Sequence, residues 1–407
     1  MEELSRRRSL LSGLEVTFLE KLKILVVSNL YPPQVIGGYE RAIADYARLL
    51  HYRGHTVIVL TTNAEGLPTE DKNSESEPIV VRRCLSLCGA WTNQGPQWFP
   101  LEQVAANTLQ NHHTLAQELR SFQPDVCLAG NMDFLGVQPL EQILAAGIPI
   151  AHYVMNSQPG YSFEFAPHSS LYRYITVSDW IRQGLQEQGY PVDTAQTIYP
   201  GAEVEEFYQA ELPPREQLRI VYASLVMHYK GADVLVEALN LLHAAGVNFT
   251  ATIAGGSLTP GFVQALHDFI ESEGLQETIR FTGVLSRQEL KQLYQTNNVW
   301  VLPSRFQEPF SIGLIEAMVA GLTIVASNTG GSPEAVEHGE TGFIFESENS
   351  LELADILSSI PRHPAEWEAI TRQGQQRALS KFGRTNTMEQ LESVLLELKL
   401  QARSDNL

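Results

Sequence analysis

The stretch that decides the fold runs from residue 303 to residue 345 and reads PSRFQEPFSIGLIEAMVAGLTIVASNTGGSPEAVEHGETGFIF. It follows a short apolar run over 299–302, which is typical of a buried strand. A helical pattern over 312–320 and a second apolar run over 323–326 lie within it. A strand, a helix and a strand in this order indicate a parallel sheet covered by helices.

The same alternation extends outward from this stretch toward the N-terminus. In the second half of the chain it predicts strands over 218–223, 248–254 and 278–281. The helices predicted between them cover 232–245, 261–272 and 287–296. In the first half it predicts strands over 23–28, 55–61, 79–83, 125–129, 148–154 and 174–177. The predicted helices of this half cover 39–53, 101–122, 138–146 and 179–188. We therefore expect an α/β protein with two doubly wound, Rossmann-like units, whose ligands bind beyond the carboxyl ends of the strands.

Length and breaks in the pattern divide the chain. At 407 residues it exceeds the roughly 250 to 300 residues that one hydrophobic core serves. A proline- and glutamate-rich stretch without clear period separates the two units. We predict a disordered leader over 1–20, an N-terminal Rossmann-like domain over 21–198 and a linker over 199–214. A C-terminal Rossmann-like domain follows over 215–382, and a final helix over 383–407 packs back on the first domain.

Composition excludes several classes of protein. With 43% hydrophobic and 18% charged residues the chain is an ordinary globular protein. Its formal net charge of -19 repels polyanions, so we do not expect a nucleic-acid partner. Three cysteines cannot all pair with one another, which favours a reducing, cytoplasmic location.

Membrane contact is a separate question. No apolar window approaches the ~20 residues that a spanning helix needs. Basic residues at 6–8 and at Arg82 and Arg83 leave open a peripheral contact with the inner face of a membrane, although scattered basic residues on an acidic protein are more often only solvated.

Two glutamates stand eight positions apart in the deciding stretch. Glu308 falls in the loop after a predicted strand and Glu316 on the first turns of the next helix, so both can face one cleft. Free amides at the start of that helix can bind a diphosphate. For either glutamate alone, a solvated charge or a partner of the helix dipole is the plainer interpretation. The combination favours a nucleotide site.

Taken whole, residues 303–345 closely resemble the donor-binding region of the retaining glycosyltransferases of family 4, which have the GT-B fold. The resemblance implies two Rossmann-like domains that face each other across a cleft, with the acceptor on the first and the nucleotide sugar on the second. It implies that Glu316 binds the donor ribose hydroxyls and Glu308 the donor sugar hydroxyls. It also implies that four backbone amides bind the diphosphate, those of Phe310, Ser311, Ile312 and Gly313.

Lys230, followed by a glycine, is a further candidate. It comes after the predicted strand 218–223 and before a helix, where a cation can neutralise a leaving diphosphate. A lysine does this in the resembling family, whereas a single exposed lysine is more often solvated. The family often has an arginine six positions earlier, where this chain has Ser224. His228 could donate in its stead, but a mostly neutral imidazole binds phosphate less strongly than a guanidinium.

Two loops of the first domain carry weaker signals. Gly37 and Gly38 precede a helix, as a close backbone approach to phosphate requires, and a plain tight turn is the alternative. In the family a glycine pair here contacts donor and acceptor. The family also has a histidine in the acceptor cleft, at a position that falls near Met155 or Asn156 in this chain. His152 comes three residues too early, so we name both as acceptor-side candidates, with a buried core histidine as the alternative for His152.

The activity we expect from the resemblance is transfer of a sugar, with retained anomeric configuration, from a UDP- or GDP-linked donor to a hydroxyl acceptor. The acceptor is a saccharide, a lipid or a small metabolite. Lys230 and Glu308 are the expected catalytic residues, without a metal ion or any further cofactor. A dehydrogenase would show Gly-x-Gly-x-x-Gly after a strand, which this chain lacks. A nucleotide-sugar epimerase and a non-catalytic partner subunit with the same fold remain alternatives.

Overall fold

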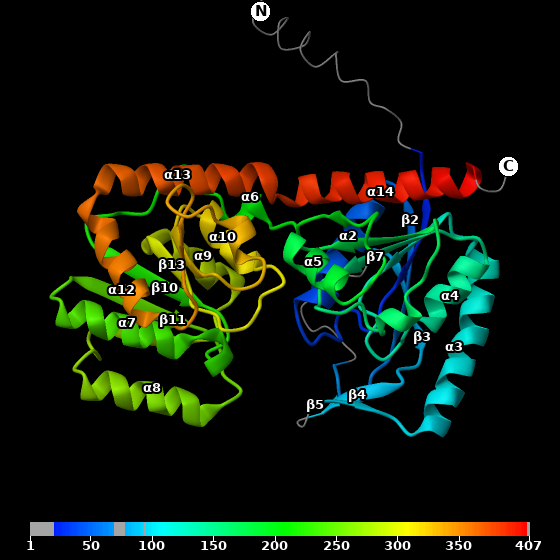
Figure 1. The fold of residues 1–407 in the computed structure, drawn as a ribbon, viewed down its shortest axis with the longest axis horizontal. Helices are drawn as coiled ribbons and strands as arrows, with labels where there is room; N and C mark the ends of the chain where they lie inside the picture. Colours follow the sequence, from blue (N-terminus) through cyan, green and yellow to red (C-terminus); the bar gives the residue numbers. More distant parts are fainter. Residues whose placement is uncertain (1–19, 69–77, 93–94, 405–407) are drawn as a thin grey trace, which may run out of the picture.

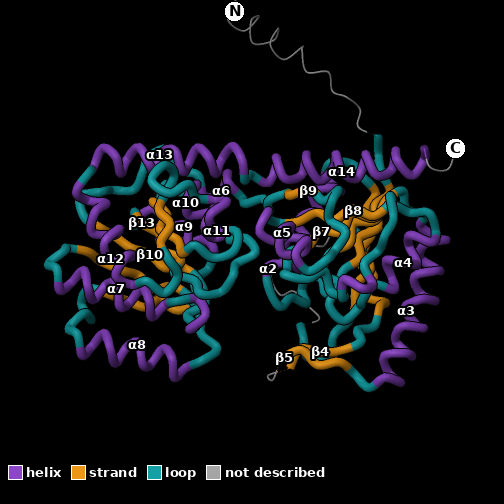
Figure 2. Tube along the Cα trace, in the orientation of Figure 1, coloured by secondary structure: helices purple, strands orange, loops and turns teal. Residues whose placement is uncertain are grey.

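The computed structural model describes residues 20–68, 78–92 and 95–404. Two lobes lie side by side, each with strands at its centre and helices outside (Figures 1 and 2). These two lobes confirm the two expected doubly wound α/β units. The predicted leader over 1–20 lies outside the described residues except for Glu20.

The N-terminal lobe is built on a seven-stranded sheet in the order β3-β2-β1-β6-β7-β8-β9, with every pair parallel. Its strands are β1 (Lys23–Val27), β2 (Thr56–Thr62), β3 (Val80–Leu85), β6 (Val126–Ala129), β7 (Ile150–Val154), β8 (Tyr172–Thr176) and β9 (Gln196–Thr197). The helices of this lobe are α2 (Gly38–Tyr52), α3 (Leu101–Phe122), α4 (Gln138–Ala145) and α5 (Asp179–Glu187). The central strands β1, β6 and β7 are largely apolar and buried, as expected of a parallel sheet with helices on both faces.

The C-terminal lobe repeats this plan with a six-stranded parallel sheet in the order β12-β11-β10-β13-β14-β15. Its strands are β10 (Leu218–Ala223), β11 (Phe249–Ala254), β12 (Ile279–Gly283), β13 (Val299–Leu302), β14 (Thr323–Ser327) and β15 (Phe343–Phe345). Its helices are α6 (Val204–Phe207), α7 (Ala232–Ala244), α8 (Pro260–Ser272), α9 (Arg287–Thr296), α10 (Ile312–Val319), α11 (Ser332–Ala335), α12 (Ser350–Ser359) and α13 (Pro364–Lys381). In both sheets the strand order reverses beside the first strand, between β1 and β6 and between β10 and β13, and ligands bind at such switch points.

The last helix, α14 (Arg384–Ser404), leaves the C-terminal lobe and lies along the N-terminal one (Figure 1), where it contacts β6, β7 and α2. Its apolar side chains belong to the N-terminal core, among them Met388, Leu391, Val394, Leu395 and Leu398. Glu392 is buried in the same contact, and its carboxylate accepts hydrogen bonds from His55 Nε2 at 2.7 Å and from Arg53 Nε at 2.7 Å. The helix is therefore part of the N-terminal lobe in space.

The chain passes between the lobes twice, and the two passages lie against each other. The Ala202 amide donates to the Phe382 carbonyl at 3.0 Å, and the Arg384 amide donates to the Ala202 carbonyl at 3.1 Å. A Cβ atom at Gly201 would overlap the backbone of Arg384, so only glycine allows this approach.

Several short elements were not predicted from the sequence, among them β9, β15, α6 and α11, and the largest of the unpredicted features is a hairpin. β4 (Gly89–Thr92) and β5 (Gly95–Trp98) form an antiparallel hairpin that joins neither of the large sheets. The glycines and the proline of this segment are typical of a loop, so residue pattern alone did not indicate strands here.

Candidate active site

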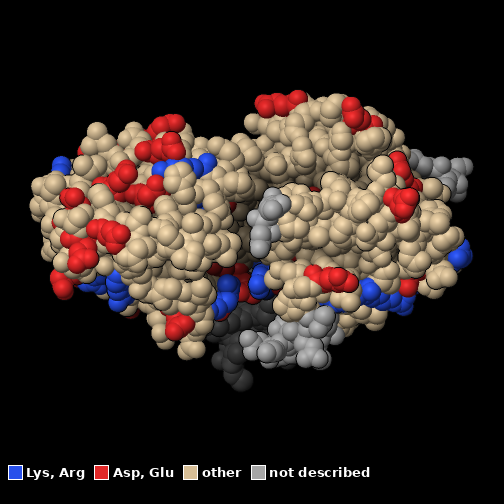
Figure 3. Space-filling view, turned by 90° about the horizontal axis from the view of Figure 1, so that it is seen from below, with Lys and Arg blue, Asp and Glu red and all other residues tan. Residues whose placement is uncertain are grey.

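A groove separates the two lobes, and acidic and basic side chains gather in it (Figure 3). A cavity of about 180 Å³ within it is lined by α2 of one lobe and by α9 and α10 of the other. Three predicted site residues, Gly38, Ile312 and Glu316, line this cavity together, although they come from different domains. The switch point of the C-terminal sheet supplies further candidates.

Lys230 and Glu308 follow β10 and β13, the two strands on either side of that switch point, and their side chains form an ion pair. Lys230 ends a short 3-10 turn over 228–230, and Gly231 takes a φ of 71°, which glycine adopts without strain. A Cβ atom at Gly231 would overlap the carbonyl oxygen of Pro303. The loop that carries Lys230 therefore packs directly on the loop that carries Glu308.

Glu308 is buried and held from several sides. The Ser304 hydroxyl donates to its Oε1 at 3.0 Å, and its backbone carbonyl accepts the Gly331 amide at 2.8 Å. Gly330 lies so close to the Glu308 backbone that a Cβ atom there would overlap it. The Lys230 ammonium also lies over the ring of Phe306, 5.3 Å from its centroid. Both charged groups are thus fixed in position at the cleft.

The start of α10 offers hydrogen-bond donors beside this pair. Ser311 is the N-cap residue, and its hydroxyl accepts from the Leu314 amide at 3.3 Å. Within the described part of the chain, no hydrogen bond engages the amides of the four residues predicted to bind the diphosphate, Phe310, Ser311, Ile312 and Gly313. Free amides at a helix N-terminus bind phosphate groups well. The Phe310 ring packs on Tyr199, with centroids 5.1 Å apart.

Glu316 lies one turn further along α10 and is buried beside Arg287 of α9, whose Nη1 is 3.1 Å from Glu316 Oε1. Arg287 also pairs with Glu203 and, at 2.7 Å, with Glu206 of the linker region. Burial raises the pKa of Glu316, and the Arg287 guanidinium acts against that shift. Sequence reasoning missed Arg287 because it stands outside the recognisable stretch.

Arg305 is a second residue that sequence reasoning missed. Its guanidinium binds both carboxylate oxygens of Asp233, at 2.7 and 2.9 Å, and its Nη1 donates to the His228 carbonyl at 2.7 Å. The amide of Arg305 and that of Phe306 both donate to the Tyr229 carbonyl at 3.0 Å. Arg305 thus positions the loop of Lys230, whereas the His228 ring is exposed and lies 3.9 Å from Asp233.

The glycine pair lies at the mouth of the N-terminal sheet, after β1. Gly37 has an extended backbone, and a Cβ atom on Gly37 or Gly38 would project into open space. Packing therefore does not require glycine here, and the space in front of the pair is free. The Gly37 amide itself is taken, because it donates to Glu40 Oε2 at 3.0 Å.

The structure separates the two acceptor-side candidates. His152 is completely buried in β7, where its ring nitrogens hydrogen-bond to Tyr172 Oη at 2.6 Å and to the Gly130 carbonyl at 3.0 Å. Burial lowers the pKa of the imidazole to about 3. The acceptor-side prediction for His152 is therefore corrected to the core-histidine alternative, since no face of the ring reaches the cleft. Asn156 is half-buried after β7 and donates to Asp133 Oδ2 at 3.3 Å.

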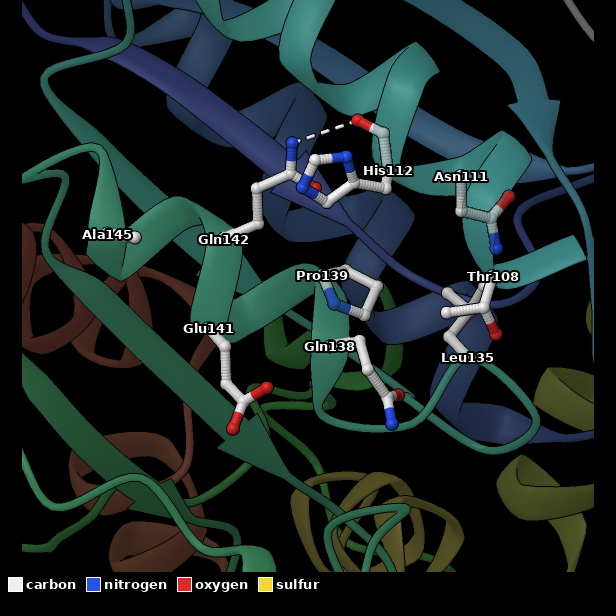
Figure 4. Close-up of a pocket in the computed structure, with 9 residues that line it drawn as sticks. All are labelled: Thr108, Asn111, His112, Leu135, Gln138, Pro139, Glu141, Gln142 and Ala145. Carbon is white, nitrogen blue, oxygen red and sulfur yellow. Dashed lines mark hydrogen bonds between the residues drawn. The ribbon is translucent and has the colours of Figure 1, made fainter. Parts of the chain in front are cut away.

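A pocket on the outside of the N-terminal lobe does not belong to this site. It lies between α3 and α4, where Gln142 donates to the His112 carbonyl (Figure 4). Its lining offers one carboxylate, that of Glu141, and none of the predicted residues. Across the described ranges, no three His, Cys, Asp or Glu side chains are grouped to hold a metal ion, and no helix there is long and apolar enough to span a bilayer.

The structure is that of a two-domain α/β protein with charged residues gathered between the lobes, and comparison with known proteins gives the family. Residues 203–377 match the family described as glycosyl transferases group 1, and residues 36–206 match Glycosyltransferase Family 4. The chain belongs to these glycosyltransferases. The GT-B fold and the family expected from the deciding stretch are thus confirmed.

Individual relatives cover most of the chain. The glycogen synthase of Mycobacterium tuberculosis is 25% identical over 388 residues, which are 89% of this chain and 91% of the relative. A GDP-mannose-dependent alpha-(1-6)-phosphatidylinositol monomannoside mannosyltransferase of the same organism is 24% identical over 361 residues, 83% and 89% of the two chains.

Solved structures share the fold. A glycosyltransferase of Rickettsia africae superimposes with a TM-score of 0.75 at 19% identity, over 93% of this chain and 99% of that one. HepE of Anabaena, crystallised in complex with UDP, superimposes with a TM-score of 0.73 at 21% identity, over 92% and 99%.

Proposed function

We propose that this glycosyltransferase moves a sugar from a UDP- or GDP-linked donor to a hydroxyl acceptor with retention of anomeric configuration. One observation carries the proposal: Lys230 and Glu308 meet at the switch point of the C-terminal sheet, beside the free amides that begin α10. This arrangement offers positive charge for a diphosphate next to a carboxylate for sugar hydroxyls. Glu316 is the proposed partner of the ribose.

The proposed step breaks the bond between the anomeric carbon and the diphosphate oxygen and forms a bond from that carbon to the acceptor oxygen. Negative charge develops on the leaving phosphate, where Lys230 and the α10 amides stabilise it. The leaving phosphate accepts the proton of the acceptor hydroxyl, so the proposal assigns no separate general base. Because Lys230 and the helix supply the positive charge, the step requires no metal ion, and the nucleotide sugar is a substrate, not a cofactor.

Two features bear on the alternatives and the location. Ser224 stands where the family often has a phosphate-binding arginine, which keeps a non-catalytic partner subunit as the second candidate. The three cysteines are all unpaired, which supports the proposed cytoplasmic location. A peripheral contact with a membrane remains part of the proposal only for a lipid acceptor.

The first experiment is a thermal-shift series with UDP, GDP and ADP and their common sugar conjugates. Ligands that bind only the folded state raise the melting temperature, so a nucleotide-selective shift identifies the donor. We expect that shift to be lost in Lys230→Ala and in Glu316→Ala. Absence of any shift in the parent protein would instead favour the non-catalytic candidate.

Lys230→Ala should also slow sugar transfer by about two to three orders of magnitude, because the charge on the leaving diphosphate loses its main partner. The matched control is Lys21→Ala. The Lys21 ammonium donates to the Arg53 carbonyl of the N-terminal lobe, whereas the proposed donor residues belong to the C-terminal lobe. Melting temperatures without nucleotide show whether leaving Glu308 without its partner impairs folding. Nearly normal transfer by folded Lys230→Ala contradicts the assignment.

A further inference from the structure

A second, larger cavity of about 700 Å³ opens on the N-terminal lobe. Six aromatic side chains line it, and we call it the aromatic pocket: Trp91, Trp98, Phe134, Tyr161, Phe163 and Tyr190. They come from the β4–β5 hairpin, from the loop after β6, from the segment after β7 with its 3-10 turn, and from the loop that follows α5. In Figure 1 the hairpin lies at the end of this lobe opposite α14.

The aromatic pocket lies beyond the carboxyl ends of β6 and β7, next to the switch point of the N-terminal sheet. Its one carboxylate, Asp133, follows β6, and the glycine pair follows the neighbouring strand β1. The Asp133 amide donates to Asn131 Oδ1 at 3.0 Å, and Asn131 Nδ2 in turn donates to Glu40 Oε1 at 3.5 Å. Glu40 accepts the Gly37 amide, so a continuous set of hydrogen bonds connects the pocket with the glycine loop at the cleft.

The rings are built as a surface with open faces. Trp91 and Trp98 both pack edge-on against Phe134, with centroids 4.8 and 5.2 Å apart, so the indoles are held in place. Yet Trp98 is 63% exposed and Phe163 is 47% exposed. Large apolar faces that stay open inside a concave pocket are typical of a binding site rather than of core packing.

Polar groups alternate with these rings. Asp133 is half-buried, and burial, with a smaller contribution from Glu40, raises the pKa of its carboxyl. Gln158 and Gln188 also line the pocket, and their side-chain amides are 3.3 Å apart. A ligand that fills this space must therefore present an apolar face to the rings and hydroxyl or amide groups to Asp133 and the glutamines.

We propose that the aromatic pocket binds a sugar ring of a saccharide acceptor. A pyranose has C–H groups on its faces, which stack on aromatic rings, and hydroxyl groups around its edge, which donate to a carboxylate. An alkyl chain would take the Asp133 carboxylate out of water and add no hydrogen bond to the one from Asn156 Nδ2, which is unfavourable. A small anion would be repelled by the same carboxylate. The inference rests on the proposed function, for which it names the acceptor class.

The test uses saturation-transfer NMR on the full chain, saturated with whichever of UDP, GDP and ADP gives the largest thermal shift. The probes are methyl α-glucoside, methyl α-mannoside, methyl β-galactoside and maltose, with geranyl phosphate as the lipid probe. We expect saturation to pass from aromatic protons to the ring protons of at least one saccharide. The signal should fall by about tenfold in Trp98→Ala and in Phe163→Ala, because each removes one stacking face.

The matched control is Tyr52→Ala, since Tyr52 is 70% exposed at the end of α2 and does not line the aromatic pocket. Its saccharide signal should equal that of the parent. A saccharide signal that is absent in the parent, unchanged in both pocket variants, or weaker than that of geranyl phosphate overturns the proposal.

The nucleotide thermal shift, measured in the same samples with UDP, GDP and ADP, separates this inference from the proposed function. A retained nucleotide shift with a lost saccharide signal in the two pocket variants supports the aromatic pocket. A parent protein that shows no shift with any of the three nucleotides contradicts the proposed function, while its saccharide signal still decides the pocket.

Discussion

Glu316 is a buried carboxylate whose charge depends on one neighbour. Burial raises its pKa, and Arg287 opposes that shift at a distance of 3.1 Å. Only the ionised carboxylate accepts hydrogen bonds from two ribose hydroxyls through both oxygens. Arg287 is therefore a positioning residue for the proposed donor site, since it keeps Glu316 charged and oriented.

Arg287→Gln should make donor binding more sensitive to acid. Without the guanidinium the pKa of Glu316 rises further, so a larger fraction is protonated at any given pH. The KM for the donor then begins to rise at a higher pH than in the parent as the pH falls. Donor KM and kcat measured across the acid range test this. Arg372→Gln is the control, because Arg372 is exposed and pairs only weakly with Glu368, at 3.7 Å. Identical pH profiles contradict the role.

How far single residues could be predicted depends on whether they lie in a recognisable stretch. Glu308 and Glu316 stand in one continuous motif, and the structure places Glu308 against Lys230 and Glu316 in the cavity between the lobes. Arg287 and Asp133 lie elsewhere in the sequence, and only the folded chain shows which partners they meet. His152 was named as a site candidate from the sequence but is a buried core residue. An apolar strand pattern does not show which of its side chains face the cleft.

At the scale of elements, α14 is attached to the N-terminal lobe by a buried carboxylate. Glu392 accepts from both His55 and Arg53, and its side chain is only 3% exposed. Removing one partner of a buried polar network leaves the others without compensation.

Glu392→Ala should therefore destabilise the N-terminal lobe by about 3 kcal/mol. The exposed pair of Arg173 with Glu397 on the same helix provides the control, and Glu397→Ala should change stability by less than about 1 kcal/mol. Urea unfolding followed by circular dichroism measures both. Equal effects of the two substitutions mean that apolar packing alone holds the helix.

Most elements could be predicted because each strand and helix carries its own pattern. The β13 strand, for example, is predicted and observed over Val299–Leu302. The β4–β5 hairpin could not be predicted. Its short, glycine-containing segments do not alternate apolar and polar residues, and its strands pair only with each other. β9 has two residues, too few to show a period.

At the scale of the whole molecule, one carboxylate joins the lobes across the groove. Glu334 of α11 accepts hydrogen bonds from the amides of Asp179 at 2.8 Å and Trp180 at 2.7 Å, which begin α5 of the other lobe. A carboxylate at a helix N-terminus is a favourable partner for those amides. Glu334 thus stabilises the arrangement in which the lobes face each other closely.

Glu334→Ala should shift the protein toward a more open arrangement, by about five- to tenfold in population for the loss of one capping interaction. Small-angle X-ray scattering should report a larger radius of gyration. Glu337→Ala is the control, because Glu337 pairs with Arg377 of its own lobe at 2.6 Å. An unchanged scattering profile in Glu334→Ala means that the cap does not hold the lobes together.

The paired passages between the lobes determine how such opening proceeds. The segments at Ala202 and Gly383 are hydrogen-bonded side by side, so neither can twist independently of the other. A single linker would let the lobes swivel in any direction, whereas two adjacent ones leave rotation about their common line as the easy motion. We therefore expect the cleft to widen by rotation about that line, so that the residues facing each other across it meet the same partners again when it closes.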